Sequence, residues 1–494
     1  MKTKSPLFRI DRLLIAALAL LAAPHVQAQL YTGTTNTGTW ASARWTNASN
    51  AVNFTNAWVQ NSDTIFLAGL TYTFAGAGTV TNGNVTVQSN ATVTFTAASG
   101  TWGTGGNVRT IDVGTNSLLD FAANAISIAA GTGFIKTGSG VFAMSGATYG
   151  GGFTLNGGTV VMRGVNTMGG GGSHVLTISN GVIAANSTRS MGNTKYGGGI
   201  RIAGNFQIGA LSNSYATNAR ALISDSANIS FANNVSLEGA TRTVTIGGNG
   251  TYTFSGVMSN GGLTVAAAAG ATGNLTLSAS NTYTGKTTIN SGTVILSGSG
   301  TAGTTASDLE VAGGLLNLSA GTKTNAAFTL SGGTITNGTL QATSYALQGG
   351  TIISNATLGT GTATVTTGTT TLNGLLNAAT LNVNSGTLTA GSAGRFTGTP
   401  TVTVSNGATL NLAGNETFGS LAGAGSVSNS AGRITAGGNN SSTTFGGVLS
   451  GAGELTKTGT GSLTLSGNNT FGGVLTVAEG KLTVSSVNNA SQDG

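Results

Sequence analysis

The sequence is poor in the residues that crosslink chains, bind metals or carry out catalysis. It contains no cysteine, three prolines and two histidines in 494 residues, and only 6% of its residues are charged. Without cysteine, neither a disulfide framework nor a thiolate metal site is possible. His174 is the one histidine after residue 28, and it cannot by itself supply the three or four ligands of a metal site. We expect no cofactor and no metal, and a fold stabilised by burial and backbone pairing.

The first 28 residues have the layout of a secretory signal peptide. Four basic residues precede an apolar run from Leu13 to Ala23, and Val26, Gln27 and Ala28 form a cleavage signal. That run is too short to span a bilayer, which needs roughly 20 residues, and no second long run follows. We predict cleavage between Ala28 and Gln29, no transmembrane segment in the mature chain, and a secreted or cell-surface location. An uncleaved membrane anchor is the less favoured alternative.

Charge in the mature chain gives no sign of nucleic-acid binding. Removal of residues 1–28 leaves 15 basic and 11 acidic residues, a net charge of +4, and the basic residues are scattered singly from Arg44 to Lys481. A phosphate-binding surface needs clustered positive charge. We therefore expect no nucleic-acid partner.

Three long segments of the chain repeat one another. Residues 453–484 are similar to residues 133–162 and 274–296, and in each copy an alternating strand leads to an aromatic residue (Tyr149, Tyr283 or Phe471) before a glycine turn and a second strand. The alternation places Leu, Val, Phe and Ile on one face and Thr, Ser and Asn on the other, which is typical of strands buried on one side. Between the second and third copies, shorter units that begin with glycine recur about every 20 residues.

This rhythm predicts an all-β fold, a parallel β-helix. Each coil of such a solenoid presents the same residue type at the same place, whereas a sandwich needs different turns. Glycine fits the corners because it adopts positive φ, and stacked asparagines can bond along the axis. At ~20 residues and about 4.8 Å per coil, residues 29–494 would form a rod roughly 110 Å long.

The sequence of the third copy resembles the autotransporter-associated β-strand repeat found in the passenger regions of bacterial autotransporters. The pattern Gly-x-Leu-Thr-Lys-Thr-Gly-Thr-Gly followed by Leu-Thr-Leu-Ser-Gly and Asn-Thr-Phe is nearly complete from Gly453 to Phe471. The second copy departs at residues 266–273, and the first lacks the Leu-Ser-Gly-Asn-Asn wording. The resemblance implies a right-handed parallel β-helical passenger at, or released from, the cell surface, most often with an adhesive role, and the repeat carries no catalytic residues.

We divide the chain into a signal peptide (1–28), an N-terminal cap with the first coils (29–105) and a β-helical passenger (106–494). The repeats of the passenger lie near 131–162, 251–297 and 443–485. All four tryptophans fall by residue 102 (Trp40, Trp45, Trp58 and Trp102). They are interpreted as a plug for the open end of the core, or alternatively as an aromatic platform for glycans. An autotransporter continues into an outer-membrane barrel. We therefore expect that the chain is part of a longer passenger, the alternative being a secreted relative that uses another route.

Parallel β-helices also include polysaccharide lyases and hydrolases, so acidic clusters were sought. Glycoside hydrolysis needs two carboxyl groups that face one bond. Asp308 and Glu310 would project from the same side of a strand about 7 Å apart, but a solvated strand face is the favoured interpretation. Asp112 and Asp120 could stack on adjacent coils, Asp120 more plausibly as a turn or edge residue. The glycines at 169–172 lack the Lys-Ser/Thr of a phosphate loop. The sequence predicts no catalytic residues and no enzyme.

The densest basic region spans residues 187–202. It contains Arg189, Lys195, Tyr196 and Arg201 among glycines. These four residues are the candidate contacts to an extracellular, acidic glycan, but an excursion loop from one coil is the favoured interpretation. The favoured function is a structural or adhesive passenger whose partners are extracellular glycans or other cell surfaces. The alternatives are a stalk for a further domain or outer-membrane barrel and, less favoured, a polysaccharide-degrading enzyme.

Overall fold

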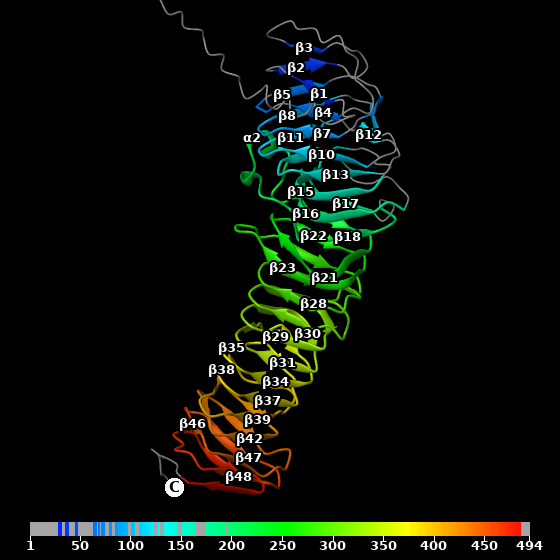
Figure 1. Ribbon diagram of the computed structural model, residues 1–494. Coiled ribbons are helices and arrows are strands. Elements are labelled where there is room, and N and C mark those ends of the chain that lie inside the picture. The colour runs from blue at the N-terminus through cyan, green and yellow to red at the C-terminus, as the bar shows by residue number, and fades with distance from the viewer. Residues whose placement is uncertain are drawn as a thin grey trace, which may run out of the picture.

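The computed structural model describes residues 28–31, 35–38, 45–47, 63–66, 68–69, 71–74, 79–81, 84–96, 100–103, 108–122, 126–128, 133–145, 151–164, 173–192 and 196–485. Short strands dominate these residues, and they lie in successive coils along a curved rod (Figure 1). The predicted signal peptide before Ala28 falls outside the described residues, and so do Trp40, Trp58 and the side chains of Trp45 and Trp102.

The strands of the first coils are three to five residues long. They are β1 (Ala28–Tyr31), β2 (Thr35–Gly38), β3 (Trp45–Asn47), β4 (Asp63–Phe66), β5 (Thr71–Phe74), β6 (Thr79–Thr81), β7 (Val85–Val87), β8 (Thr92–Phe95), β9 (Gly100–Gly103), β10 (Arg109–Val113), β11 (Leu118–Phe121), β12 (Ile126–Ile128), β13 (Phe134–Thr137) and β14 (Val141–Met144).

The middle coils contain longer strands that turn a corner, and two short helices. The elements are β15 (Phe153–Met162), β16 (Leu176–Ala185), β17 (Arg189–Met191), β18 (Ile200–Ile202), β19 (Phe206–Ile208), η1 (Ser212–Ser214), α2 (Thr217–Arg220), β20 (Ile229–Phe231), β21 (Val235–Ile246), β22 (Thr251–Phe254), β23 (Met258–Ala267), β24 (Asn274–Leu277), β25 (Thr287–Ile289), β26 (Thr293–Leu296) and β27 (Leu309–Val311).

The last coils return mainly to short strands. They are β28 (Leu315–Thr324), β29 (Ala327–Leu330), β30 (Thr334–Gln341), β31 (Ser344–Leu347), β32 (Gly350–Ile352), β33 (Ala356–Leu358), β34 (Thr362–Val365), β35 (Thr369–Leu372), β36 (Leu375–Leu376), β37 (Thr380–Val383), β38 (Thr387–Ala390), β39 (Thr401–Val404), β40 (Thr409–Leu412), β41 (Glu416–Phe418), β42 (Ser420–Gly423), β43 (Ser426–Asn429), β44 (Arg433–Ala436), β45 (Thr443–Phe445), β46 (Val448–Ser450), β47 (Glu454–Lys457), β48 (Ser462–Leu465), β49 (Leu475–Val477) and β50 (Lys481–Val484).

Apart from β3, the described strands pair in parallel with strands of neighbouring coils. The register is regular: Thr380 of β37 lies opposite Thr401 of β39, which lies opposite Ser420 of β42. The described strands form two long sheets and two short ones, and β2 with β3 is the antiparallel pair among them. The predicted all-β parallel solenoid is confirmed. No helix among the described residues is long and apolar enough to span a membrane.

The coils differ in length, which corrects the expected length of the rod. Phe328, Tyr345 and Ala363 lie opposite one another at steps of 17 and 18 residues, whereas Ile200 lies opposite Val235, a step of 35 residues. The solenoid has about 18 turns, so at about 4.8 Å per turn it is roughly 90 Å long rather than 110 Å. The longer coils of the N-terminal half account for the difference.

The core is one continuous column of inward-facing side chains. Along β37, Leu381 and Val383 are fully buried while Thr380 and Asn382 between and beside them are partly exposed. Aromatic rings stack on successive coils in places, for example Phe231 on Phe254 at 5.0 Å between ring centroids. Alternation in the sequence thus becomes an apolar interior covered by hydroxyl and amide side chains.

Asparagines at the coil corners bond along the axis, as the sequence predicts, but mostly to backbone. The side-chain oxygens of Asn228, Asn234 and Asn249 accept hydrogen bonds from the N–H groups of the next coil at 2.7 to 3.0 Å. Glycine is needed where coils approach closely. At Gly158, with φ of +63°, a Cβ would lie 2.3 Å from the carbonyl oxygen of Gly138, so no other residue fits that corner.

Candidate functional site

An excursion from one coil gives the rod its most distinctive lateral feature. Residues 209–228, here called the insertion, run between β19 and β20 and contain η1 and α2. The insertion folds back towards earlier coils, so that α2 lies beside β8 and β11 (Figure 1). The amide nitrogen of Asn218 donates to the hydroxyl of Thr92 at 2.9 Å, 126 residues away. The insertion therefore fastens several coils together along the axis.

A second apolar cluster holds the insertion in place. Strands β11, β14, β15 and β16 carry apolar side chains on their outward face as well as their inward face, and these outward residues are buried (Leu118, Val141, Ala143, Val161 and Ala184). Ala219 and Ile223 of the insertion pack against them. Outward apolar residues on a solvated face would otherwise be exposed, so the local sequence of these strands matches the presence of the insertion.

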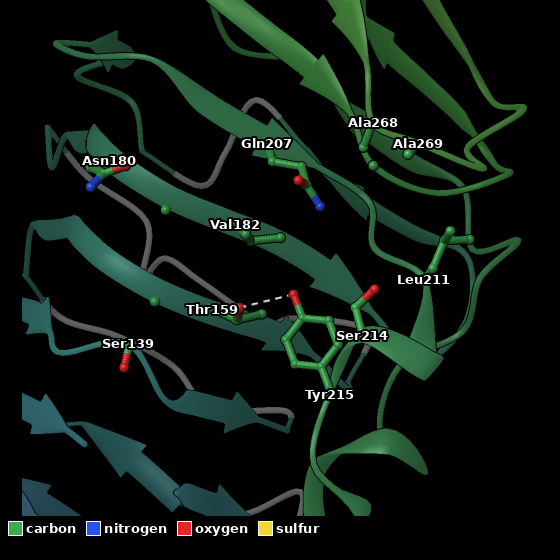
Figure 2. A pocket seen from close by; sticks show the side chains of 13 residues that line it. Ser139, Thr159, Asn180, Val182, Gln207, Leu211, Ser214, Tyr215, Ala268 and Ala269 are labelled. Carbon is green, nitrogen blue, oxygen red and sulfur yellow. Dashed lines mark hydrogen bonds between the residues drawn. The ribbon is translucent and has the colours of Figure 1, made fainter. Parts of the chain in front are cut away.

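A groove of about 380 Å³ lies between the insertion and the sheet (Figure 2). Thr159, Val182 and Gln207 occupy consecutive rungs of its floor, because Thr159 pairs with Val182 and Val182 with Gln207. The insertion lines one side of the groove with Leu211, Ser214 and Tyr215. The other lining residues come from the coils themselves (Ser139, Gly158, Asn180, Gly181, Gly247, Ala268 and Ala269). The residues that line the groove carry no charge.

Tyr215 is fixed at the wall of this groove. Its hydroxyl lies 3.0 Å from the hydroxyl of Thr159, a contact drawn in Figure 2. Burial raises the pKa of Tyr215, opposed by its hydrogen bond to Thr159, so the phenol is a neutral group at physiological pH. The groove offers hydroxyls, amides and one aromatic ring, which suit binding of a neutral polar molecule rather than acid–base catalysis.

The structure does not bring the predicted glycan contacts together. Arg189 lies on β17 and Arg201 on β18, in different sheets, and Lys195 is outside the described residues. Arg189 donates to the carbonyl oxygens of Met162 and Arg163 and to the side chain of Asn186, and Arg201 is exposed, with the carboxylate of Glu238 at 3.9 Å. The prediction that Tyr196 contacts a glycan is wrong, because its side chain is buried.

Tyr196 is fully buried in the core rather than exposed among the glycines. Its backbone has φ of +51°, and its carbonyl accepts a hydrogen bond from Asn233. The ring therefore packs inward where the sequence interpretation placed it on the surface. Burial raises the pKa of Tyr196.

The acidic candidates are each engaged in separate structural contacts. Glu310 accepts from Lys286 and from Ser331, and Asp308 accepts from the N–H of Ala327 at 3.3 Å. Asp112 and Asp120 lie on β10 and β11, consecutive strands of one coil, so they do not stack on adjacent coils. No group of three or more potential metal ligands occurs among the described residues.

Asp120 is a buried acid within β11 rather than the turn or edge residue favoured from the sequence. It forms an ion pair with Arg163, which comes from a later coil. Burial raises the pKa of Asp120, and the charge and hydrogen bond of Arg163 oppose that shift. His174 is half-buried just before β16, and residues 169–172 are outside the described residues.

A second groove near the end of the rod has a different chemistry. It is lined by Asn415, Glu416, Arg433 and Glu454 among others. The carboxylate of Glu416 accepts from the backbone N–H groups of Arg395 and Phe396, and burial raises the pKa of Glu416. Arg433 pairs with Glu454 at 2.8 Å. The charged side chains of this groove are therefore engaged by one another or by the backbone, and the groove contrasts in charge with the neutral groove beside the insertion.

Sequence reasoning missed a buried lysine in two of the three long repeats. Lys136 donates to the carbonyl oxygens of Thr137, Gly138 and Gly157 at 2.5, 2.9 and 3.2 Å. Burial lowers the pKa of Lys136 to about 7, with Asp112 opposing the shift. Its side chain is fully buried, and its amino group joins a turn in one coil to the next coil.

Lys457 makes the same three contacts in the third repeat. It donates to Thr458, Gly459 and Glu479 at 2.5, 2.7 and 3.3 Å and is fully buried. The equivalent residue of the second repeat is Val265, also buried. The recurring Lys-Thr-Gly motif was the signal that could have revealed this lysine. In the first and third copies the lysine acts as a clamp, because it hydrogen-bonds two neighbouring coils.

Comparison with known protein families places these clamps within a recognised unit. Residues 134–162, 272–296 and 455–484 match the passenger-associated-transport-repeat. The chain carries three passenger-associated-transport-repeats. The resemblance to an autotransporter passenger repeat is therefore confirmed, and Lys136 and Lys457 lie in the first and third of these units. No curated protein and no solved structure matched the chain.

Proposed function

We propose that this chain is the rod of an autotransporter-type passenger, displayed at or released from the bacterial surface, and that its role is structural and adhesive rather than catalytic. The observation that carries the proposal is the presence of three passenger-associated-transport-repeats within one continuous parallel solenoid. Such a repeat implies export, because it is a unit of passenger regions.

The chemistry of the lateral surface supports a binding role over catalysis. Asp120 and Glu310, two of the acids considered from the sequence, are held by Arg163 and by Lys286, and Glu416 of the charged groove is held by backbone N–H groups. These contacts leave the three acids poorly placed as paired acid and base. A long rod covered in hydroxyl and amide groups presents many weak contacts to another surface, and repeated weak contacts give strong overall attachment through multivalency.

The proposal is tested with beads that carry the purified mature chain. Beads coated with residues 29–494 are expected to adhere to polysaccharide-coated surfaces or to other cells more strongly than beads coated with an unrelated β-solenoid. Equal adhesion of the two bead types would refute the adhesive role. Turnover of a polysaccharide by the purified chain, detected as new reducing ends or unsaturated sugars, would refute the non-catalytic role.

A further inference from the structure

We propose that the groove beside the insertion is a binding site for a neutral oligosaccharide. This assignment deepens the proposed adhesive function, on which it rests, by giving the rod a ligand class and a location. The groove is the place where the regular lateral face of the solenoid is interrupted by a folded segment that is anchored to distant coils.

The shape of the groove suits an extended ligand. Its lining residues come from six successive coils, from Ser139 after β13 to Ala268 after β23. At about 4.8 Å per coil, it follows the rod axis for roughly 24 Å. Its long axis therefore matches a short linear chain that lies along the rod, with the insertion as a side wall (Figure 2).

The chemistry of the groove selects against charge. Polar groups are contributed by hydroxyls and amides (Ser139, Thr159, Asn180, Gln207, Ser214 and Tyr215), and among the residues that the structure describes no acidic or basic side chain lines it. An acidic glycan would lose solvation there without gaining an opposite charge. A neutral sugar presents hydroxyls that both donate and accept, which matches the amide and hydroxyl inventory of the walls.

Preorganisation distinguishes this groove from an ordinary surface hollow. Gln207 donates to the carbonyl of Gly209 at 3.0 Å, and Tyr215 is held against Thr159. Both side chains are thus oriented before a ligand arrives, which limits the entropy lost on binding. Glycines at 158, 181 and 247 leave the backbone bare between these side chains, so one face of a sugar ring can approach the backbone closely.

The test uses purified residues 29–494 and direct binding measurements. Neutral linear oligosaccharides, namely gluco- and manno-oligosaccharides, are compared with oligogalacturonates of equal length by calorimetry. At least one neutral series is expected to bind, and the acidic series is expected to bind at least tenfold more weakly. Failure of both neutral series to bind, or equal binding of the acidic series, would overturn the assignment.

Variants locate the binding. Replacement of both Asn180 and Gln207 by alanine is expected to weaken binding about tenfold or more, since two amide hydrogen-bonding groups are removed. The matched control is Glu454→Gln in the charged groove, which should bind as the wild type does. A circular dichroism melt establishes that both variants are folded, and Asn180→Ala alone, at an exposed position, serves if the double variant is not.

The two proposals fail in distinguishable ways. If coated beads adhere but the Asn180/Gln207 variant adheres equally and binds sugars equally, the groove assignment is wrong and the adhesive function stands. If the purified chain binds neutral sugars and loses that binding in the variant, but beads do not adhere, the adhesive function fails alone. Binding of an uncharged peptide in place of all sugars would also overturn the saccharide assignment.

Discussion

Replacement of Lys457 by methionine tests whether the buried lysine clamps neighbouring coils. Methionine, whose side chain is one heavy atom shorter, fills a similar volume at this buried position while it removes the three hydrogen bonds to Thr458, Gly459 and Glu479. The loss of each hydrogen bond to a buried carbonyl costs about 1 kcal/mol or more. Part of that loss is offset, because a buried amino group no longer has to be desolvated.

The balance of these effects is a destabilisation of about 2 kcal/mol, confined to the coils around the clamp. Solenoid coils contact only their neighbours, so stability is a local property. Native-state hydrogen exchange of β47 to β50 is the appropriate assay, and 2 kcal/mol corresponds to exchange roughly 30-fold faster through local opening. Strands β29 to β34, which lie about 90 to 130 residues before Lys457 in the chain, are expected to exchange at the wild-type rate.

Lys286→Met is the matched control. Lys286 forms an ion pair with Glu310 at the surface, and its side chain is 47% exposed, so its removal should cost about 0.5 kcal/mol. If Lys457→Met and Lys286→Met change local exchange equally, the clamp contributes no more than a surface ion pair and the reasoning is refuted.

Three further predictions follow from the structure. The pKa of Lys136 is lowered by burial from 10.5 to about 7, so the unfolded chain holds this proton more tightly, and the stability of the surrounding coils should rise between pH 7 and 10. Comparison of wild type with Lys136→Met by denaturant unfolding measures this rise, and parallel pH profiles would contradict it. Ile223→Asp, which buries an unpaired carboxylate in the cluster under the insertion, should expose residues 209–228 to limited proteolysis while the rod stays folded; Asn213→Asp at an exposed position should not. Mass spectrometry of the exported chain should find Gln29 at its N-terminus, and retention of Met1 in the exported protein would contradict the predicted signal peptide.

The fold was predictable from sequence because every coil repeats the same pattern of inward apolar residues, outward polar residues and corner glycines. Alternating Leu and Thr on strands such as β48, with glycine at the corners, leaves few architectures other than a parallel solenoid. The repeat wording also located the units that match the passenger-associated-transport-repeat. Coil length was less predictable, since excursions such as the insertion add residues without adding a turn.

The candidate site was not predictable from the same reasoning. Residues 209–228 lack the alternation of apolar and polar residues that the strands before and after them show. This interruption was the one sequence signal of a folded excursion. Tyr196 was misplaced because its glycine-rich surroundings favour a surface loop, whereas the ring turns into the core. The outward apolar residues Val141 and Val161 could be recognised only once the insertion was seen to cover them, because burial by a distant segment leaves no local pattern.

Surface labelling of living cells tests the central claim most directly. An epitope tag is placed between Asn406 and Gly407, in an exposed turn where neither a strand nor the core is disturbed, and cells express the complete gene. The account predicts that an antibody labels the tag on intact cells, or detects it in the medium, without permeabilisation. Labelling that appears only after the cells are permeabilised would contradict an exported passenger rod.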